Sequence, residues 1–561
     1  MLKPVIALFL ITLLFSCTAN AQGWLWGRDA KINSNGTEEG GPVCIDNSGN
    51  IYGINSVGSL LFTPALIISK YGSFYVSDSL DFSQSVVYSL DDAGNYRWAT
   101  GTFGGLQLDH IGADAAGNVY ISGHKTPTPG YFAGLTFPGT IYQNFIVKLN
   151  SSGLGLWAKV LPSGIQVNDI AVSHIGDIYF TGFINNSPIT FGSTTIASHQ
   201  LEDVIVGKYD NSGNQQWALS LSGDSTDYGT FLSVNDNGSV YITGASSSSS
   251  LIIGHDTLFN TAAAGNLFFF VTRLDTGRNM IWGKSIIPSP SGGGFSGIAS
   301  NNKGDLYCSG GYINWMYSGA DSLPYDTSTI GKICLFRFDS AGHLKWAHSI
   351  NNDSLLGTCA IDADDCGNIW VSGSLGHLSG TISDQMYLAR FDTTGNLKAT
   401  LFLKSGGDDA NWIKLDNQGN LYVTGDYMQN PFIFGNDTLE NTASNEMLFV
   451  GKFIYELAEC VLDTIPLNHT KTATENVLNS PIKLTLYPNP TTNEFTIHAE
   501  TPFPPASKAE FYDLAGRLIN TYPISGNNSE ISTANLTPGM YQCRIYAGGN
   551  NPVTKKLVIM K

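Results

Sequence analysis

Ala115-Ala-Gly-Asn-Val-Tyr120 is one of seven copies of a short pattern that recurs through this 561-residue chain. Each copy has a turn that contains glycine, then a polar, an apolar and an aromatic residue, and in six copies another glycine ends the strand. Glycine supplies the positive φ that a tight turn needs, and Asn or Asp caps the turn locally. The pattern therefore indicates a hairpin. The copies begin at Asn47, Ala115, His174, Asp236, Asn302, Asp365 and Asn417.

A second pattern alternates with the first and ends in tryptophan. Val147-Lys-Leu-Asn150, for example, leads through a glycine turn to Trp157, and the sixth copy reaches Ala399 where tryptophan is expected. Each unit of about sixty residues therefore holds two hairpins, or four strands. The tryptophans of the pattern are Trp98, Trp157, Trp217, Trp282 and Trp346.

Repeats of this length and type predict an all-β fold, a seven-bladed β-propeller in which each blade covers the face of its neighbour. The last unit has a third strand at 448–453 but no tryptophan strand after it, whereas an unassigned tryptophan strand lies at Trp24 and Trp26. We predict that this N-terminal strand closes the ring by pairing near Phe449, since closure removes an exposed edge. Trp24 or Trp26 then takes the place that Trp98 has in its own blade.

Residues 1–21 have the pattern of a secretory signal peptide. Lys3 is followed by an apolar run over 5–15 and by the small residues Ala19 and Ala21. This predicts Sec export to the periplasm, with cleavage after Ala21. A lipoprotein signal that ends at Cys17 is the competing interpretation. No later segment has the length and apolar character of a transmembrane span.

Charge and cysteine content limit the partners. The formal net charge of −17 repels phosphate backbones, which argues against nucleic-acid binding. Seven cysteines remain after signal cleavage, and an odd number excludes complete pairing within the chain. Cys359 and Cys366 are near enough in sequence to pair across a hairpin.

A different pattern begins near residue 484. Residues 458–483 are polar and read as a linker between a propeller at 22–457 and a C-terminal domain at 484–561. Several short strands with tight turns predict a small Ig-like β-sandwich there. The landmarks are Tyr487, Pro488, Asn489 and Pro490, then Asp513, Gly516 and Arg517, then Gly539 and Tyr541, and finally Lys555 and Lys556.

These landmarks resemble the type A sorting domain of the type IX secretion system of Bacteroidetes. The resemblance implies that the secretion machinery is a partner, and that the protein crosses the outer membrane and becomes secreted or attached to the outer cell surface. The repeat units resemble a β-propeller repeat family that is common in secreted Bacteroidetes proteins. That family has no single assigned activity, so the second resemblance speaks only for the architecture.

No residue is predicted to be catalytic, to bind a cofactor or to bind a metal. Turns such as the one at 46–50 have some of the spacing of a calcium loop, but an apolar strand follows where the last acid would stand. A quinone-dependent dehydrogenase has a similar tryptophan repeat, yet no cofactor ligand is evident. Two acidic pairs, Asp408 with Asp409 and Asp224 with Asp227, lie just before predicted inner strands and are candidates for a channel site.

The sequence thus favours a non-catalytic propeller scaffold, secreted or attached to the surface, that recognises a glycan or protein in adhesion or binding. The alternative is an extracellular polysaccharide hydrolase or lyase that uses the channel face. A pocket at the channel mouth with two or more acids within about 10 Å would favour the enzyme. Apolar and hydroxyl side chains there would favour the binding protein.

Overall fold

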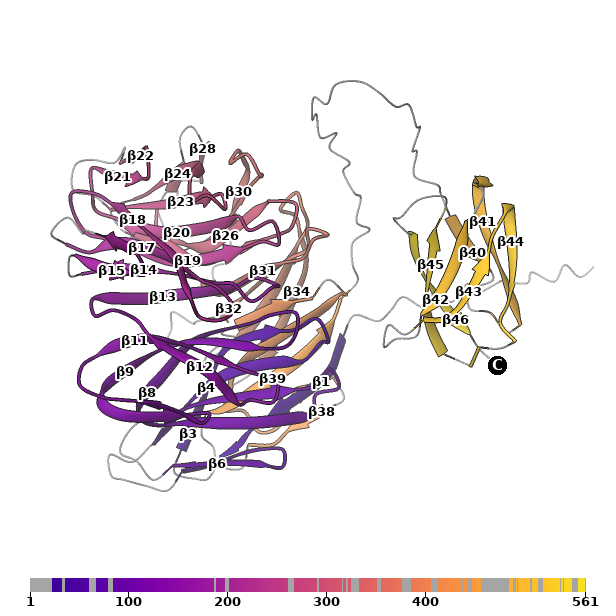
Figure 1. The fold of residues 1–561 in the computed structure, drawn as a ribbon, viewed down its shortest axis with the longest axis horizontal. Helices are drawn as coiled ribbons and strands as arrows, with labels where there is room; N and C mark the ends of the chain where they lie inside the picture. The colour runs from indigo at the N-terminus through magenta and orange to yellow at the C-terminus, as the bar shows by residue number, and fades with distance from the viewer. Residues whose placement is uncertain are drawn as a thin grey trace, which may run out of the picture. The chain divides into compact units, whose positions relative to one another are not determined.

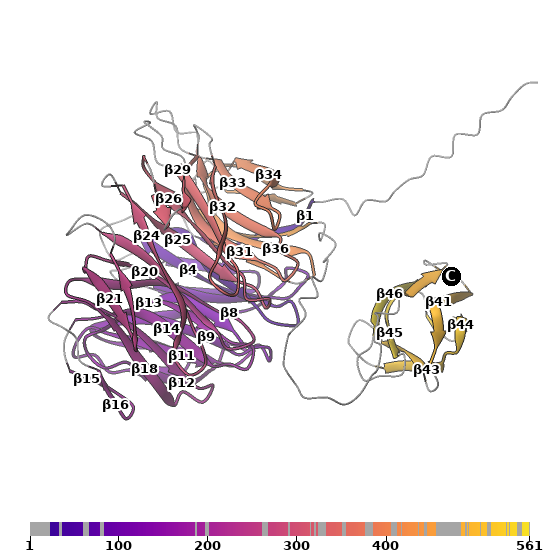
Figure 2. The same ribbon diagram turned by 90° about the horizontal axis from the view of Figure 1, so that it is seen from above.

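The computed structural model divides the chain into two compact units, Met1–Leu462 and Asp463–Lys561. Every named element in the described residues is a β-strand (Figures 1 and 2). The structure describes residues 23–455 and 484–559 except for 33–35, 60–66, 79–83, 186–187, 197–200, 261–266, 290–291, 315, 319–320, 324–331, 351–354, 376–384, 405–411, 417, 436, 442–445, 488–490, 492, 505–506, 513–517, 535, 538 and 547–552.

The first unit repeats one antiparallel motif in which four strands pair in their order along the chain. The long strand β8 takes part in two such motifs, because its first part pairs with β7 and its second part with β9. The first three motifs are β3 (Gly36–Ile45), β4 (Ile51–Ser59), β7 (Gln84–Leu90) and β8 (Tyr96–Ala113); β8, β9 (Val119–Phe132), β11 (Gln143–Leu149) and β12 (Gly155–Val160); and β13 (Ile165–Val172), β14 (Ile178–Ile184), β17 (Asp203–Tyr209) and β18 (Gln215–Ser222).

The motif continues through the rest of the unit, and the fourth place of its last copy is filled from the N-terminal side. These motifs are β19 (Asp227–Val234), β20 (Val240–Ser246), β23 (Phe268–Leu274) and β24 (Met280–Pro288); β25 (Gly293–Ser300), β26 (Leu306–Tyr312), β29 (Lys332–Phe338) and β30 (Leu344–Ile350); β31 (Leu355–Ala363), β32 (Ile369–Leu375), β33 (Gln385–Phe391) and β34 (Leu397–Lys404); and β35 (Trp412–Leu415), β36 (Asn420–Tyr427), β39 (Met447–Ile454) and β1 (Gly23–Asp29).

Short additional strands lie mostly between the second and third strands of a motif. Gly192 and Gly435 have positive φ in two of the tight hairpins that these strands form, which is the conformation that glycine adopts most readily. The additional strands are β2 (Lys31–Ile32), β5 (Ile67–Tyr71), β6 (Phe74–Asp78), β10 (Leu135–Phe137), β15 (Ile189–Phe191), β16 (Thr194–Ile196), β21 (Ser250–Ile253), β22 (Asp256–Phe259), β27 (Met316–Ser318), β28 (Asp321–Ser322), β37 (Phe432–Phe434) and β38 (Asp437–Leu439).

Strand β1 lies beside strands from the far end of the same unit (Figure 2). It pairs antiparallel with β39, with Trp26 opposite Lys452 and Asp29 opposite Phe449. Trp26 donates its indole N–H to the Asp92 carbonyl at 3.1 Å, in the turn between the third and fourth strands of the first motif. Trp24 instead packs against Phe434 in its own motif, with ring centroids 4.6 Å apart.

Three of the other repeat tryptophans, Trp98, Trp282 and Trp346, lie like Trp26 rather than Trp24. Trp98 donates to the Ser151 carbonyl at 2.9 Å, which again belongs to the glycine turn of the following motif. A Cβ built on Gly153 in that turn would lie 2.8 Å from the Trp98 ring, so only glycine allows this approach. Trp282 and Trp346 donate to Ser340 and Thr393 in the same way.

Hydrogen bonds link each motif to the next along the chain, and they also link the last motif to the first. The links, in chain order, are Trp98 to Ser151, Lys148 to Asn211, Leu232 to Asp169, Trp282 to Ser340, Trp346 to Thr393, Leu415 to Asp362 and Trp26 to Asp92.

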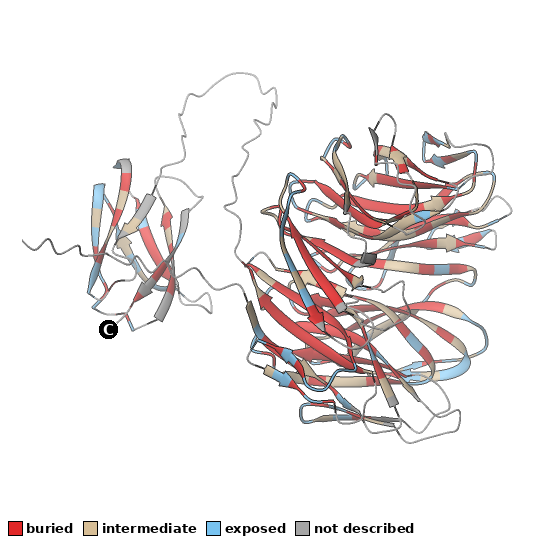
Figure 3. Cartoon of the chain, turned by 180° about the vertical axis from the view of Figure 1, so that it is seen from behind, coloured by how far each residue is buried: buried red, intermediate tan, exposed pale blue. Residues whose placement is uncertain are grey.

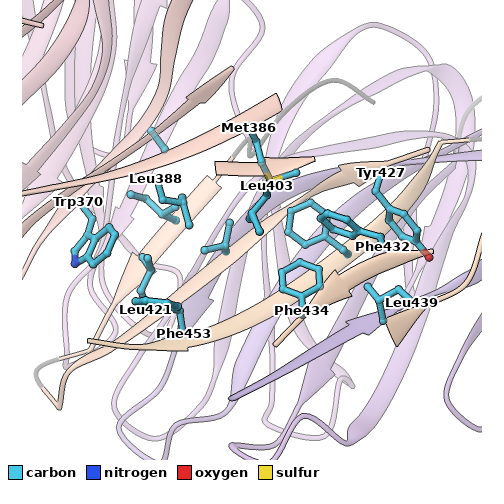
Figure 4. Packing of buried hydrophobic residues seen from close by; sticks show 14 of the residues in the cluster. Trp370, Met386, Leu388, Leu403, Leu421, Tyr427, Phe432, Phe434, Leu439 and Phe453 are labelled. Carbon is cyan, nitrogen blue, oxygen red and sulfur yellow. The ribbon is translucent and has the colours of Figure 1, made fainter. Parts of the chain in front are cut away.

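The core lies between the sheets (Figure 3). Figure 4 shows one cluster, in which Trp370 and Leu388 from one motif meet Leu421 and Phe453 from the next. Burying a large apolar side chain contributes roughly 1.5–3 kcal/mol. No single sheet has enough partners of its own to bury both of its faces, so each motif depends on its neighbours.

The second unit consists of two antiparallel sheets around a separate core. Phe495 and Phe511 meet edge to face in that core, at a centroid distance of 5.9 Å. One sheet has β40 (Leu484–Tyr487), β41 (Glu494–Phe503) and β44 (Gly526–Ser532), and the other has β43 (Leu518–Pro523), β42 (Lys508–Tyr512), β45 (Gly539–Tyr546) and β46 (Val553–Ile559).

Candidate functional site

A cavity of about 270 Å³ in the first unit is lined by the first strand of every motif. These strands are β3, β8, β13, β19, β25, β31 and β35. A turn follows each of these strands, and one residue caps it, as Asp46 does after β3. The residue three places before this cap is aliphatic in all seven strands: Val43, Ile111, Ile170, Leu232, Ile298, Ile361 and Ile413. This position of the repeat is therefore apolar in every strand, and the ionisable residues of the cavity stand one place before it or one place after it.

His110 and Asp169 form the first polar group in the cavity. The His110 Nδ1 lies 3.4 Å from the Asp169 Oδ1, and the backbone N–H of Leu232 donates to the Asp169 Oδ2 at 2.8 Å. Burial raises the pKa of Asp169 to about 6, although the nearby His110 and the backbone donors lower it. Asp169 therefore joins β13 to β8 on one side and to β19 on the other.

Asp362 and Lys414 form the second polar group. The Lys414 Nζ lies 3.0 Å from the Asp362 Oδ2, and the same oxygen accepts the backbone N–H of Leu415 at 2.7 Å. Asp362 thus joins β31 to β35, just as Asp169 joins β13 to β19. Both acids already hold backbone donors of a neighbouring strand, so their oxygens stabilise the packing of the motifs.

Aromatic and hydroxyl side chains complete the lining. The rings of Trp412 and His110 meet edge to face at a centroid distance of 6.2 Å, although Trp412 belongs to the last motif and His110 lies in the part of β8 that belongs to the second motif. Phe231 also lines the cavity. The hydroxyls of Ser233 and Ser300 hydrogen-bond to one another at 2.7 Å.

Of the two acidic pairs predicted from the sequence, Asp224 and Asp227 do not line this cavity. Asp227 is buried at the start of β19, accepts the Ser248 hydroxyl at 2.9 Å and does not line the cavity. Asp224 accepts the backbone N–H and the hydroxyl of Ser249 in an exposed turn. Asp408 and Asp409 lie outside the described residues.

Sequence reasoning missed the five residues that give the cavity its chemistry, namely His110, Asp169, Asp362, Trp412 and Lys414. Their common signal is their place in the repeat. His110, Asp169 and Trp412 each stand four residues before the cap of the first-pattern turn, as an alignment of the seven copies would have displayed.

The turns themselves do not have the free oxygens that a calcium site needs. Asp46 accepts the backbone N–H groups of Ser48 and Asn50 with one oxygen, and the Asn50 amide and the Tyr52 hydroxyl with the other. Within the described residues, no group of three or more His, Cys, Asp or Glu side chains is arranged to hold a metal ion.

Three cysteines of the first unit are buried thiols. Cys44, Cys308 and Cys334 are free and buried, and burial raises their pKa values. Cys366 is disulfide-bonded. The side chain of Cys359, which the sequence offers as its partner, lies outside the described residues.

The sorting-domain landmarks lie in the second unit. Tyr487 is on β40, Gly539 and Tyr541 are on β45, and Lys555 and Lys556 are on β46. The Tyr541 hydroxyl donates to the Thr537 carbonyl at 2.9 Å. Pro488, Asn489, Pro490, Asp513, Gly516 and Arg517 lie outside the described residues.

Fold and landmarks together define an all-β protein with a C-terminal targeting domain. Residues 485–560 match the family of secretion system C-terminal sorting domains, which confirms the resemblance stated above. The chain therefore carries a type IX secretion sorting domain, and this implies export to the cell surface or the extracellular space. In the part of the chain that the structure describes, we find no helix with the length and apolar character to cross a bilayer.

The chain also has more distant relatives. An uncharacterized WD repeat-containing protein of Acanthamoeba polyphaga mimivirus is 19% identical over an alignment of 419 residues that covers 62% of this chain and 30% of that protein. The chain thus spans about a third of that relative's length.

Two solved proteins of unknown function also show similarity. The one from Bacteroides caccae has 13% identity, a TM-score of 0.27 and coverage of 56% of this chain and 82% of its own. The one from Dyadobacter fermentans has 9% identity, a TM-score of 0.35 and coverage of 63% and 95%. Similarities this low carry no argument about fold or function.

Proposed function

We propose that residues 22–457 form a seven-bladed β-propeller that β1 closes into a ring. The hydrogen bonds that lead from each motif to the next, and from Trp26 to Asp92, support a closed circle. The cavity supports it too, because one cavity is lined by the first strand of every motif. A ring of this kind has no open edge between its first and last blades, which protects it from edge-to-edge association.

The remaining segments complete an export route. Residues 1–21 act as the signal peptide for Sec export, residues 458–483 as a linker, and residues 484–561 as the domain that the type IX machinery recognises. The exported propeller is then a secreted or surface-attached scaffold that binds a glycan or a protein. It uses its central cavity or the loops around it, where rigid blades hold variable residues in place.

The observation that best supports a binding function is that both acids in the cavity already have hydrogen-bond and charge partners. Asp169 and Asp362 each accept a backbone N–H of the neighbouring inner strand and each have a basic partner. A hydrolase needs one acid free to protonate a leaving group and another free to act as base or nucleophile. These two acids instead hold the blades together, which favours a binding protein.

One observation favours the enzyme as a second candidate. The contact between the His110 Nδ1 and Asp169 leaves the His110 Nε2 available as a general base, which is the arrangement that many hydrolases use. An extracellular polysaccharide hydrolase or lyase would use His110 in this role.

A paired screen separates the two functions. The purified mature protein is applied to a glycan array, and the same polysaccharides are incubated with it and analysed for release of reducing ends or unsaturated products. We expect binding without turnover. Turnover that disappears in His110→Asn would establish the enzyme instead, and the lack of both binding and turnover, in a panel that includes cell-surface proteins of the producing bacterium, would contradict the proposed function.

A further inference from the structure

One level of the cavity combines aromatic rings with a carboxylate. At the position four residues before the turn cap, the inner strands carry Pro42, His110, Asp169, Phe231 and Trp412, all of which line the cavity. We call these five residues the aromatic cage. The two remaining strands carry the small residues Gly297 and Ala360 at the same position.

The rings of the cage come together from different blades. His110 and Trp412 are in edge-to-face contact at 6.2 Å, and the Asp169 Oδ1 is 3.4 Å from the His110 Nδ1. The side chains of His110 and Asp169 keep 18% and 16% of their exposure. The cage is therefore largely desolvated but still open to the cavity, and electrostatic interactions are stronger there than in water.

The charges that face the cavity favour a positively charged guest. Asp362 and Lys414 neutralise each other, and burial raises the pKa of the Cys44 thiol, which keeps that group uncharged. Asp169 is then the acid without a permanently charged partner, because its neighbour His110 is charged only when protonated. An anion would meet this carboxylate, whereas a cation would meet both the carboxylate and the negative faces of the rings.

We propose that the aromatic cage binds a compact alkylated ammonium group, such as a trimethylammonium. This inference rests on the proposed function and names the chemical class of ligand for its cavity. Rings of Trp and Phe with a nearby carboxylate attract quaternary ammonium ions through cation–π and charge interactions. A volume of about 270 Å³ lies at the lower end of small-molecule sites, roughly 300–1,000 Å³, and suits a compact group better than an extended oligosaccharide.

Calorimetric titration with choline and with 3,3-dimethylbutan-1-ol tests the proposal. The two probes have nearly the same shape, but only choline carries the positive charge. We expect the full mature protein at pH 8 to bind choline at least about tenfold more tightly than the neutral alcohol. Equal affinities, or no choline binding at millimolar concentration, would overturn the proposal.

Variants then assign the binding to the cage. Trp412→Leu removes the largest ring, and Asp169→Asn removes the charge but keeps an oxygen that can accept the Leu232 N–H. Each is expected to lower choline affinity about tenfold or more, in line with roughly 1–2 kcal/mol for a desolvated cation–π contact. Phe259→Leu is the matched control, because Phe259 is 66% exposed on β22 and does not line the cavity.

Two further readouts keep the result interpretable. Circular dichroism shows whether each variant is folded, and Phe231→Leu replaces Asp169→Asn if that variant unfolds. Unchanged choline affinity in folded cage variants would rule out the cage. Failure of choline with persistent binding on the glycan or protein panel would reject the ammonium ligand alone, whereas failure of both screens would count against the proposed function.

Discussion

Glu38 is a buried acid whose stability cost depends on pH. It lies on β3 with no exposed surface, and it accepts the Tyr71 hydroxyl through a long contact of 3.4 Å. Burial, with a smaller contribution from Asp29, raises its pKa from 4.5 to about 7 despite the hydrogen bonds that lower it. The folded state thus holds the proton more tightly than the unfolded chain does, so stability from this group is lost as the pH rises from about 4.5 through 7.

Glu38→Gln is therefore expected to stabilise the protein above pH 7. The amide keeps the shape and an acceptor for Tyr71 but removes the buried charge, which costs on the order of 3 kcal/mol at pH 8. At pH 4 the glutamate is protonated in both states, and the gain should disappear. Urea unfolding of both proteins at pH 4 and pH 8 measures the difference.

Glu39→Gln is the matched control, because Glu39 is the next residue and is exposed. It changes the net charge by the same amount without removing a buried carboxylate. A similar gain in both variants at pH 8 would show that the overall charge of the chain, rather than the burial of Glu38, is responsible.

Among the strands, β1 owes more of its stability to the single residue Trp26 than to the number of residues that it pairs. The Trp26 side chain is 6% exposed, and it contacts both β39 of its own motif and the turn of the next motif. Trp26→Ala is expected to lower the free energy of unfolding by about 3–5 kcal/mol, because it leaves a large cavity at the junction of two motifs. Guanidinium unfolding followed by circular dichroism gives the value.

Leu25→Ala provides the control for the same strand, since Leu25 is 51% exposed and points away from that junction. We expect a change within about 0.5 kcal/mol, as for other surface substitutions. If Trp26→Ala changed the free energy of unfolding as little as Leu25→Ala, β1 would not stabilise the ring, and the proposed closure would lose its main support.

The elements were predictable to the extent that each is determined by local sequence. Glycine turns and the aromatic residues after them marked the second strand of every motif, because a turn with positive φ has few sequence solutions. The hairpins β5–β6 and β21–β22 were not anticipated, since neither contains the repeated turn or the tryptophan. The choice of Trp26 over Trp24 also needed the structure, because both residues fit the strand pattern equally well.

The cavity was not predictable from local sequence for a different reason. His110, Asp169 and Trp412 are far apart in the chain and chemically unlike one another, and only the packing of several motifs brings them to one level. Acids that lie close together in the chain, such as Asp224 and Asp227, are the candidates that the sequence offers. A site assembled from one residue per motif has no such local signature.

At the scale of the whole molecule, export and folding are assigned to separate units. The boundary falls at Leu462, and the core of the second unit, which includes Phe495 and Phe511, is made entirely of its own residues. Deleting residues 463–561 should therefore leave the propeller folded but keep it within the cell envelope. Cell fractionation of the producing bacterium, with an antibody against the propeller, follows the location, and thermal unfolding of the purified ring follows its stability.

The converse experiment completes this prediction. Fusing residues 463–561 to an unrelated soluble reporter that carries a signal peptide should send the reporter to the cell surface or the medium, which is the result expected when the machinery recognises the sorting domain alone. Tyr541→Ala in the fusion should weaken export, since it opens the core of the domain and removes the hydrogen bond to Thr537. Export of the truncated propeller at normal levels would instead mean that the first unit contains an export signal of its own. The assignment of export to the second unit alone would then be wrong.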